Sequence, residues 1–538
     1  MPPSPVVDVH THVFNHHALA IQGLTKSQLM AHGIKAKRAL RIARTFDRLV
    51  SRLAKEPEIA GEIGRRALGR AGLDDLSRSI GEIAADRRLM LLDSSGPECL
   101  GGGADGAGPE DDWDSLATDM QALLEEVGEE FVEVGPESFV GDDRDALARR
   151  TARVIERFLT WLASKMEAGA EVIQFVFALL QTTEKLEERI LAAYDGERMD
   201  LCVFHMMDMT YAYEVDPLGA PVPAAELPAP PSMPWPDQIR EMVDLTWSAR
   251  GRLAGFVAFD PRRPDALEHV QQAIGAGLVG VKIYPPMGYR PLDARYLDAF
   301  VTLYTWCSGQ GIPVLAHCSA TGFEAWVGHG TYSDPGGEDG QGWDAVLARF
   351  PELHLCMGHT GAGHLENFPA RGVHQAHDPK VPFPGWYDDM ENCSMERCYA
   401  LKVLALCARY AHAYCDFSYL MHATDKGSLD RRRLVGNLRR ALTGPDGEAL
   451  SRSLMYGSDW HMPEALNEAG DLLRAFREIF ARKGLPCSAP GFFGDNAIRF
   501  LNLGAAVARL RAHLPAPTPD QAATLAAWSV LDAAAASD

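Results

Sequence analysis

Short runs of apolar and β-branched residues recur along the chain, and most of them follow residue 198. Eight such runs predict β-strands. They occupy residues 6–10, 199–205, 251–259, 278–284, 312–317, 353–359, 412–418 and 453–459. Between the later runs lie segments with helical spacing of apolar positions that end in glycine, such as 265–277 and 297–309. Alternation of strand and helix favours parallel pairing with right-handed crossovers, so the pattern predicts an α/β chain folded as a (β/α)₈ TIM barrel.

The connection between the first two predicted strands is far longer than an ordinary βα loop. We therefore expect a distorted barrel with a large helical insertion after strand 1. The expected limits are 1–17 and 166–514 for the barrel, 18–165 for the insertion and 515–538 for a C-terminal tail. Residues 166–198 would return as the first barrel helix, and the alanine-rich tail would either pack as a helix or stay loose.

Charge is unevenly distributed within the expected insertion. Residues 26–88 carry 15 Lys and Arg against 8 Asp and Glu, whereas residues 110–145 carry 14 acidic residues and one arginine. These blocks indicate solvated helix faces that attract one another, a cap over a site, or a contact between subunits.

The whole chain has a formal net charge of −21, which disfavours nucleic acid and anionic membranes as partners. The sequence shows no basic segment followed by a long apolar run at its start, and no stretch of about 18 apolar residues, so we expect neither a signal peptide nor a membrane span. Its ten cysteines are scattered and form no C-x-x-C pair. They are typical of buried, reduced thiols in a cytoplasmic protein.

Two histidines stand one residue apart in the first predicted strand, in the stretch VVDVHTHVF. Side chains alternate between the faces of a strand, so His10 and His12 are expected to point the same way. Neutral imidazole is the commonest nitrogen ligand of metals in proteins, and this pair is a candidate for a metal site.

Polar residues also stand where later predicted strands end. They are Lys282 in strand 4, His317 in strand 5, His359 in strand 6 and Asp459 in strand 8. The carboxyl ends of barrel strands meet at one face, where the chemistry of such barrels is performed. Buried polar groups without partners are costly, so packing alone does not explain this recurrence.

The ordered set H-x-H, Lys, His, His and Asp resembles the amidohydrolase superfamily, and specifically its amidohydrolase-related branch, which includes aminocarboxymuconate semialdehyde decarboxylase-like proteins. The resemblance covers residues 6–16 and about 199–503, including the closing FFGDNAIRFLNL at 492–503. It does not cover the insertion.

This resemblance implies that His10, His12, His317 and Asp459 are metal ligands and that Asp459 also transfers protons. His359 would bind a second metal ion, or would orient the attacking water without binding metal. For Lys282 three roles stay open: a carboxylated lysine that bridges two ions, an unmodified lysine that holds a substrate carboxylate, or a structural partner of a carboxylate.

The implied cofactor is a divalent metal such as Zn²⁺, as one or two ions. The implied activity is hydrolysis of an amide, a cyclic amide, or a lactone or other ester of a small molecule by metal-activated water. The alternative is a non-oxidative decarboxylase that uses one metal ion. A third hypothesis is a barrel without catalytic activity that serves for binding. Relatives are often dimers or tetramers, so a homo-oligomer is expected by analogy.

Four further residues are candidates for substrate binding. Tyr289 and Arg290 follow strand 4, where arginine suits bidentate binding of a carboxylate. Trp460 and His461 follow Asp459 and are expected in the pocket wall. Asp416, at the end of strand 7, is interpreted as structural.

Overall fold

The computed structural model describes most of the barrel and parts of the segment inserted after its first strand. The described residues are 4–13, 15–31, 33–54, 118–123, 154, 157–158, 161, 178–194, 196–216, 219–320, 322–326, 328–337, 340–361, 385–387, 390–393, 395, 398–460, 469–481, 485 and 490–536. Contacts within the chain group it into two compact units, residues 1–20 with 183–538, and residues 21–182.

Eight parallel strands form one sheet, paired in chain order from β1 to β8. They are β1 (Val7–Thr11), β2 (Leu201–His205), β3 (Leu253–Ala258), β4 (Gly280–Ile283), β5 (Val314–His317), β6 (Leu355–Gly358), β7 (Ala413–Asp416) and β8 (Leu454–Met455). β2 to β8 each lie within a run expected from the sequence, and β1 extends one residue beyond its expected run of 6–10. The predicted (β/α)₈ fold is confirmed.

The sheet closes between β1 and the segment that follows β8. The backbone N–H of Val9 donates to the carbonyl of Tyr456 at 3.1 Å, and the N–H of Asp459 donates to the carbonyl of His10 at 2.8 Å. A further parallel bridge joins Thr11 to Trp460. β8 is shorter than expected: the N–H of Tyr456, the residue after it, donates to the carbonyl of Phe492, and Asp459 has a φ of 63°. Asp459 therefore stands on a turn at the end of the barrel, not on the strand.

Glycines let large rings fit between neighbouring strands. Gly280 of β4 is the register partner of Phe256 on β3, and a Cβ on Gly280 would lie 2.4 Å from the Phe256 ring. Gly255 stands in the same relation to Phe204 of β2. A side chain at either glycine would force the ring or the strand to move.

Helices follow the strands, as the alternation predicts. In the barrel unit they are α8 (Thr183–Ala192), α9 (Trp235–Ser248), α10 (Ala266–Ala276), α11 (Leu297–Gln310), α12 (Trp343–Arg349), α13 (Tyr399–Arg409), α14 (Leu429–Thr443), α15 (Gly447–Ser451), α16 (Ala469–Phe480), α17 (Asn496–Leu501), α18 (Leu503–His513) and α19 (Pro519–Ala535). α8 lies in the range expected for the first barrel helix. α10 ends at Gly277, as expected, whereas α11 runs past the expected Gly309 and ends at Gly311; both capping glycines have positive φ. None of the described helices combines the length and apolarity needed to cross a membrane.

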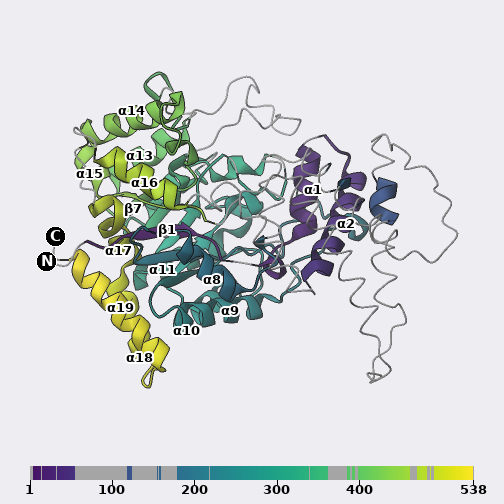
Figure 1. Cartoon of the computed structure of the whole chain (residues 1–538), viewed down its shortest axis with the longest axis horizontal. Helices are drawn as coiled ribbons and strands as arrows, with labels where there is room; N and C mark the ends of the chain where they lie inside the picture. Colours follow the sequence, from purple (N-terminus) through teal and green to yellow (C-terminus); the bar gives the residue numbers. More distant parts are fainter. Residues whose placement is uncertain are drawn as a thin grey trace. The chain divides into compact units, whose positions relative to one another are not determined.

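The C-terminal residues pack as helix α19, which lies beside α18 (Figure 1). Thr518 and Gln521 form a capping box at its start, and Pro519 occupies its first position. Trp528 is fully buried in the main apolar cluster together with Val7, Phe256 and residues of α17. The expected tail is therefore a docked helix in its described part.

The second unit holds α1 (Ile21–Ala31) and α2 (Ala36–Ala54), which pack against each other. α2 buries Phe46 and exposes Arg48, whose guanidinium pairs with the carboxylate of Asp119. This ion pair joins the basic block to the acidic block. Apart from 118–123, the acidic block lies outside the described residues.

Candidate metal centre

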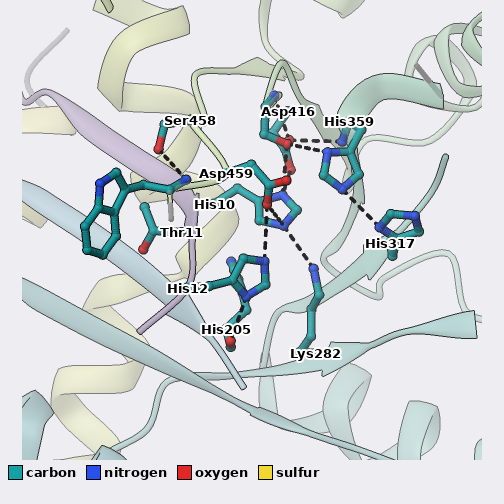
Figure 2. A network of polar contacts seen from close by, with 12 residues as sticks. His10, Thr11, His12, His205, Lys282, His317, His359, Asp416, Ser458 and Asp459 are labelled. Carbon is teal, nitrogen blue, oxygen red and sulfur yellow. Dashed lines mark hydrogen bonds and ion pairs between the residues drawn. The ribbon is translucent and has the colours of Figure 1, made fainter. Parts of the chain in front are cut away.

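Buried polar side chains gather at the carboxyl ends of the strands (Figure 2). We call this group the strand-end cluster. It comprises His10, His12, His205, Lys282, His317, His359, Asp416, Ser418 and Asp459. The six polar residues that the sequence pattern singled out all belong to it.

His10 is oriented by a carboxylate. Its Nδ1 lies 3.0 Å from Oδ2 of Asp416, and since a carboxylate only accepts, Nδ1 carries the proton. The lone pair therefore resides on Nε2, which lies 3.0 Å from Nζ of Lys282 and 3.5 Å from Oδ1 of Asp459. A histidine whose second nitrogen donates to a carboxylate is the common arrangement of a metal ligand.

His12 is oriented by a backbone carbonyl. Its Nδ1 donates to the carbonyl oxygen of His205 at 3.0 Å, so its lone pair also resides on Nε2. That atom lies 3.2 Å from Oδ1 of Asp459. The Oδ1 atom is buried and accepts no hydrogen bond in the structure.

The Nε2 lone pairs of His10 and His12 thus point toward Oδ1 of Asp459, and Nζ of Lys282 lies beside Nε2 of His10. The lone pairs and the carboxylate oxygen repel one another, and a proton or a metal cation between these atoms removes the repulsion. The ligand atoms of His10, His12 and Asp459 all lie within 4.8 Å of one another. Imidazole and carboxylate ligands in this number are typical of a zinc site with an open position.

A second set of three ligating groups consists of His10, His359 and Asp416. The hydroxyl of Ser418 already lies among them, 3.1 Å from Nδ1 of His10 and 2.9 Å from Nδ1 of His359, and it bonds to Oδ1 of Asp416. This position is therefore filled by a hydrogen-bonding group of the protein itself.

His317 reaches the cluster through His359. Nδ1 of His317 lies 3.0 Å from Nε2 of His359, and the ring centroids are 4.6 Å apart. This separation suits a hydrogen bond between the rings, and it also suits two nitrogens that share one ion. The ring of Tyr284 also packs against His317, with ring centroids 4.5 Å apart.

Burial dominates the electrostatics of the cluster. It lowers the pKa of His12 to about 3 and holds the pKa of His10 and His359 well below the ordinary range, so all three imidazoles are neutral, as metal ligands must be. Burial also raises the pKa of Asp459 well above its usual range, against the opposing charge of Lys282. The pKa of Lys282 falls to about 8 because burial outweighs the attraction of Asp459 and Asp416.

Asp8 joins β1 to the segment that carries Asp459. Its Oδ1 accepts from the backbone N–H of His10 at 3.1 Å and of Ser458 at 3.0 Å, and its Oδ2 accepts from the hydroxyls of Ser458 and Tyr194. Burial raises the pKa of Asp8 to about 7 despite these donors. The network fixes the backbone on both sides of the His10–Asp459 approach.

The four residues expected to bind substrate have different surroundings. The hydroxyl of Tyr289 is engaged by two backbone groups, the carbonyl of Phe259 and the N–H of Tyr284, each at 3.1 Å. The guanidinium of Arg290 stacks on Tyr332, 4.6 Å from the ring centroid. Trp460 is buried beside the barrel closure, and His461 lies outside the described residues. Tyr289 thus contacts backbone that follows β3 and β4, and Arg290 contacts a ring that follows β5.

Sequence reasoning missed His205 and Ser418. His205 ends β2, so the rule that identified the other strand-end residues also applies to it. Its Nε2 donates to the carbonyl of Val9 at 2.9 Å. Ser418 lies two residues beyond β7, and no sequence pattern marks it. Asp416 was expected to be structural; its carboxylate accepts from Nδ1 of His10 and from the backbone N–H of His359, the residue after β6.

No protein-family model and no curated protein matches this chain. Among solved structures, it is similar to an uncharacterised TIM-barrel protein from Bordetella bronchiseptica, with 14% identity and a TM-score of 0.34 over 60% of this chain and 83% of that one. It is also similar to an amidohydrolase from Burkholderia multivorans in two structures, one with bound zinc and one with bound HEPES. These have 15% and 16% identity and TM-scores of 0.35, over 61% of this chain and 91% of that chain. Likeness at this level does not determine the reaction.

Proposed function

We propose that this chain is a metal-dependent hydrolase of the amidohydrolase superfamily, acting on an amide, a cyclic amide, or a lactone or other ester of a small molecule. One observation carries the proposal. Oδ1 of Asp459 is buried without a hydrogen bond and faces the Nε2 atoms of His10 and His12, both of which are oriented by partners on their other nitrogen. The donor set favours a divalent ion such as Zn²⁺.

A divalent ion held there would lower the pKa of a bound water and polarise a carbonyl group of the substrate. The protein supplies the proton transfers. The raised pKa of Asp459 suits a carboxylate that accepts a proton from the attacking water and returns it to the leaving group. The burial of the cluster keeps bulk water away from these groups.

The chemical state of Lys282 would determine whether the site binds one metal ion or two. With its pKa lowered to about 8, about a tenth of its amine is neutral at pH 7, and only a neutral amine combines with carbon dioxide. A carboxylated Lys282 would add ligand oxygens beside Nε2 of His10. His317 and His359, whose facing nitrogens are 3.0 Å apart, would then bind the second ion.

The second candidate is a non-oxidative decarboxylase with one metal ion. It is favoured if Lys282 stays unmodified, because Asp459 and Asp416 both favour its charged form, and an ammonium group at this position suits a substrate carboxylate. The two candidates therefore differ in the chemical state of a single side chain.

Elemental analysis of protein expressed with bicarbonate and zinc tests the proposal. We expect about two ions per chain if Lys282 is carboxylated and about one if it is not. His12→Gln should lose metal, whereas His354→Gln should retain it, because His354 precedes β6 at the opposite end of the barrel. Equal metal content in both variants would contradict the proposal. A screen of lactones, cyclic amides, N-acyl amino acids and carboxylated aromatics then separates hydrolase from decarboxylase.

A further inference from the structure

Asp416 has donors around both of its carboxylate oxygens. Oδ1 accepts from the backbone N–H groups of His359 and Ser418, each at 3.1 Å, and from the hydroxyl of Ser418. Oδ2 accepts from Nδ1 of His10 at 3.0 Å and from the thiol of Cys356 at 3.4 Å. Because every neighbour is a donor, Asp416 acts here as an acceptor only.

The hydrogen positions around Ser418 follow from this. A serine hydroxyl has one hydrogen, and here it points to Asp416. The oxygen of Ser418 is then the acceptor for Nδ1 of His359, 2.9 Å away. His359 therefore carries its proton on Nδ1, and its Nε2 presents a lone pair toward His317.

The hydroxyl oxygen of Ser418 also lies 3.1 Å from Nδ1 of His10, so it contacts two imidazoles that are far apart in the sequence. Its position is closely packed. A Cβ on Gly457 would lie 3.1 Å from Cβ of Ser418 and 3.0 Å from Cβ of His10. Gly457 thus allows the close approach that sets the serine between the rings.

We infer that Ser418 is a positioning residue of the metal centre: its hydroxyl passes the orienting effect of Asp416 on to His359 and fixes Nε2 as the basic nitrogen of that ring. The inference rests on the proposed function for its consequence, which is metal affinity. Its structural part, the tautomer of His359, is independent of any metal.

The test compares Ser418→Ala with Ser418→Thr, which keeps the hydroxyl, and with Ser453→Ala. Ser453 is a matched control, since it is also a buried serine but bonds to the carbonyl of Ala449. Two quantities are measured: the dissociation constant for Zn²⁺ by competition with a chelator, and the tautomer of His359 by nitrogen-15 NMR of the metal-free protein labelled at histidine. Thermal unfolding of each variant checks that the fold is retained.

We expect Ser418→Ala to weaken zinc binding by roughly 10- to 100-fold, the range for loss of a partner of a metal-ligating histidine. In Ser418→Ala we also expect His359 to populate both neutral tautomers instead of the Nδ1–H form alone. His10 should keep its proton on Nδ1, where it bonds to Asp416. Ser418→Thr should restore both quantities, and Ser453→Ala should change neither. An unchanged His359 tautomer in Ser418→Ala overturns the inference, as does unchanged zinc affinity. If the wild type binds no zinc, the proposed function fails, while the tautomer measurement still decides the role of Ser418.

Discussion

Oδ1 of Asp459 lies 3.2 Å from Nε2 of His12 and accepts no hydrogen bond, although both atoms are buried. The two residues belong to the first strand and to the segment after the last strand, and they meet where the barrel closes. This close contact between a carboxylate oxygen and an imidazole nitrogen yields the most direct prediction. Asp459→Asn replaces an anionic oxygen with a neutral amide, so zinc affinity should fall by more than about 100-fold, beyond the effect typical of an outer partner. Chelator competition measures the change. Asp425→Asn, on an exposed aspartate, is the control, and a loss of less than about threefold at Asp459 would argue against ligation.

The two histidines that flank β6 give a matched pair. His359 follows the strand inside the strand-end cluster, whereas His354 precedes it and bonds to the carbonyl of Phe500. His359→Gln should lower zinc affinity by roughly 10-fold or more. His354→Gln should leave affinity unchanged and cost about 1 kcal/mol of stability for the lost hydrogen bond. Equal zinc dissociation constants for the two variants would count against a role for His359.

A substitution at His205 distinguishes the contribution of its side chain from that of its backbone carbonyl. Its carbonyl orients His12, while its side chain donates to the carbonyl of Val9. His205→Leu keeps the first contact and removes the second. We expect the free energy of unfolding in urea to fall by about 1–3 kcal/mol, because the carbonyl of Val9 is left without this donor. Zinc affinity should stay within about threefold of the wild type. A large loss of affinity with unchanged stability would instead indicate that the imidazole of His205 itself contacts the metal.

Lys282 predicts how the stability of the metal-free protein depends on pH. Its pKa in the folded protein is about 8, below the ordinary value of 10.5, chiefly because it is buried. Between these two values the unfolded chain binds more protons than the folded chain, so the free energy of unfolding contributed by this group increases as pH rises through that window. Below about pH 8 both states are charged, and the contribution of Lys282 does not change.

Urea unfolding of chelator-treated protein at about pH 7.5 and about pH 9.5 measures this increase. Lys282→Met should lack it. Lys402→Met, at a lysine paired with Asp334, serves as the control and should retain it. The same rise in wild type and Lys282→Met would contradict the prediction.

Gly251 tests the docking of the C-terminal helix. It has a φ of 92°, and a Cβ there would lie 2.5 Å from Cβ of Ala527 on α19. Gly251→Ala should therefore cost at least about 1 kcal/mol of stability, from backbone strain and from the clash. Gly309→Ala is the control: Gly309 lies inside α11 with open space around its Cβ position, and alanine should stabilise there by about 0.5–1 kcal/mol. Thermal unfolding compares the stability of the two variants. Unchanged stability in Gly251→Ala would mean that α19 shifts to accommodate the added methyl group.

The sequence predicted the strands well because each is an apolar run between helical segments, and the barrel then follows from their number and alternation. The polar residues at the ends of β1, β4, β5 and β6 were predictable for the same reason, because each stands at the end of such an apolar run. By contrast, Ser418 contacts His359 only because β7 lies beside β6, and its oxygen serves two rings that no spacing connects. The hydroxyl of Tyr289 bonds to the backbone for a similar reason, since loop conformation and not residue type decides its partner.

The candidate ligands stand at residues 10, 12 and 459, at both extremes of the barrel sequence. A ribosome must therefore release nearly the whole barrel before the last of them is available. Contacts between positions so far apart in sequence carry a loop-closure entropy cost before they can form. Metal binding would then stabilise the barrel only after its strands have assembled. A chain truncated before Asp459 would lack this stabilisation, however well its earlier strands had paired.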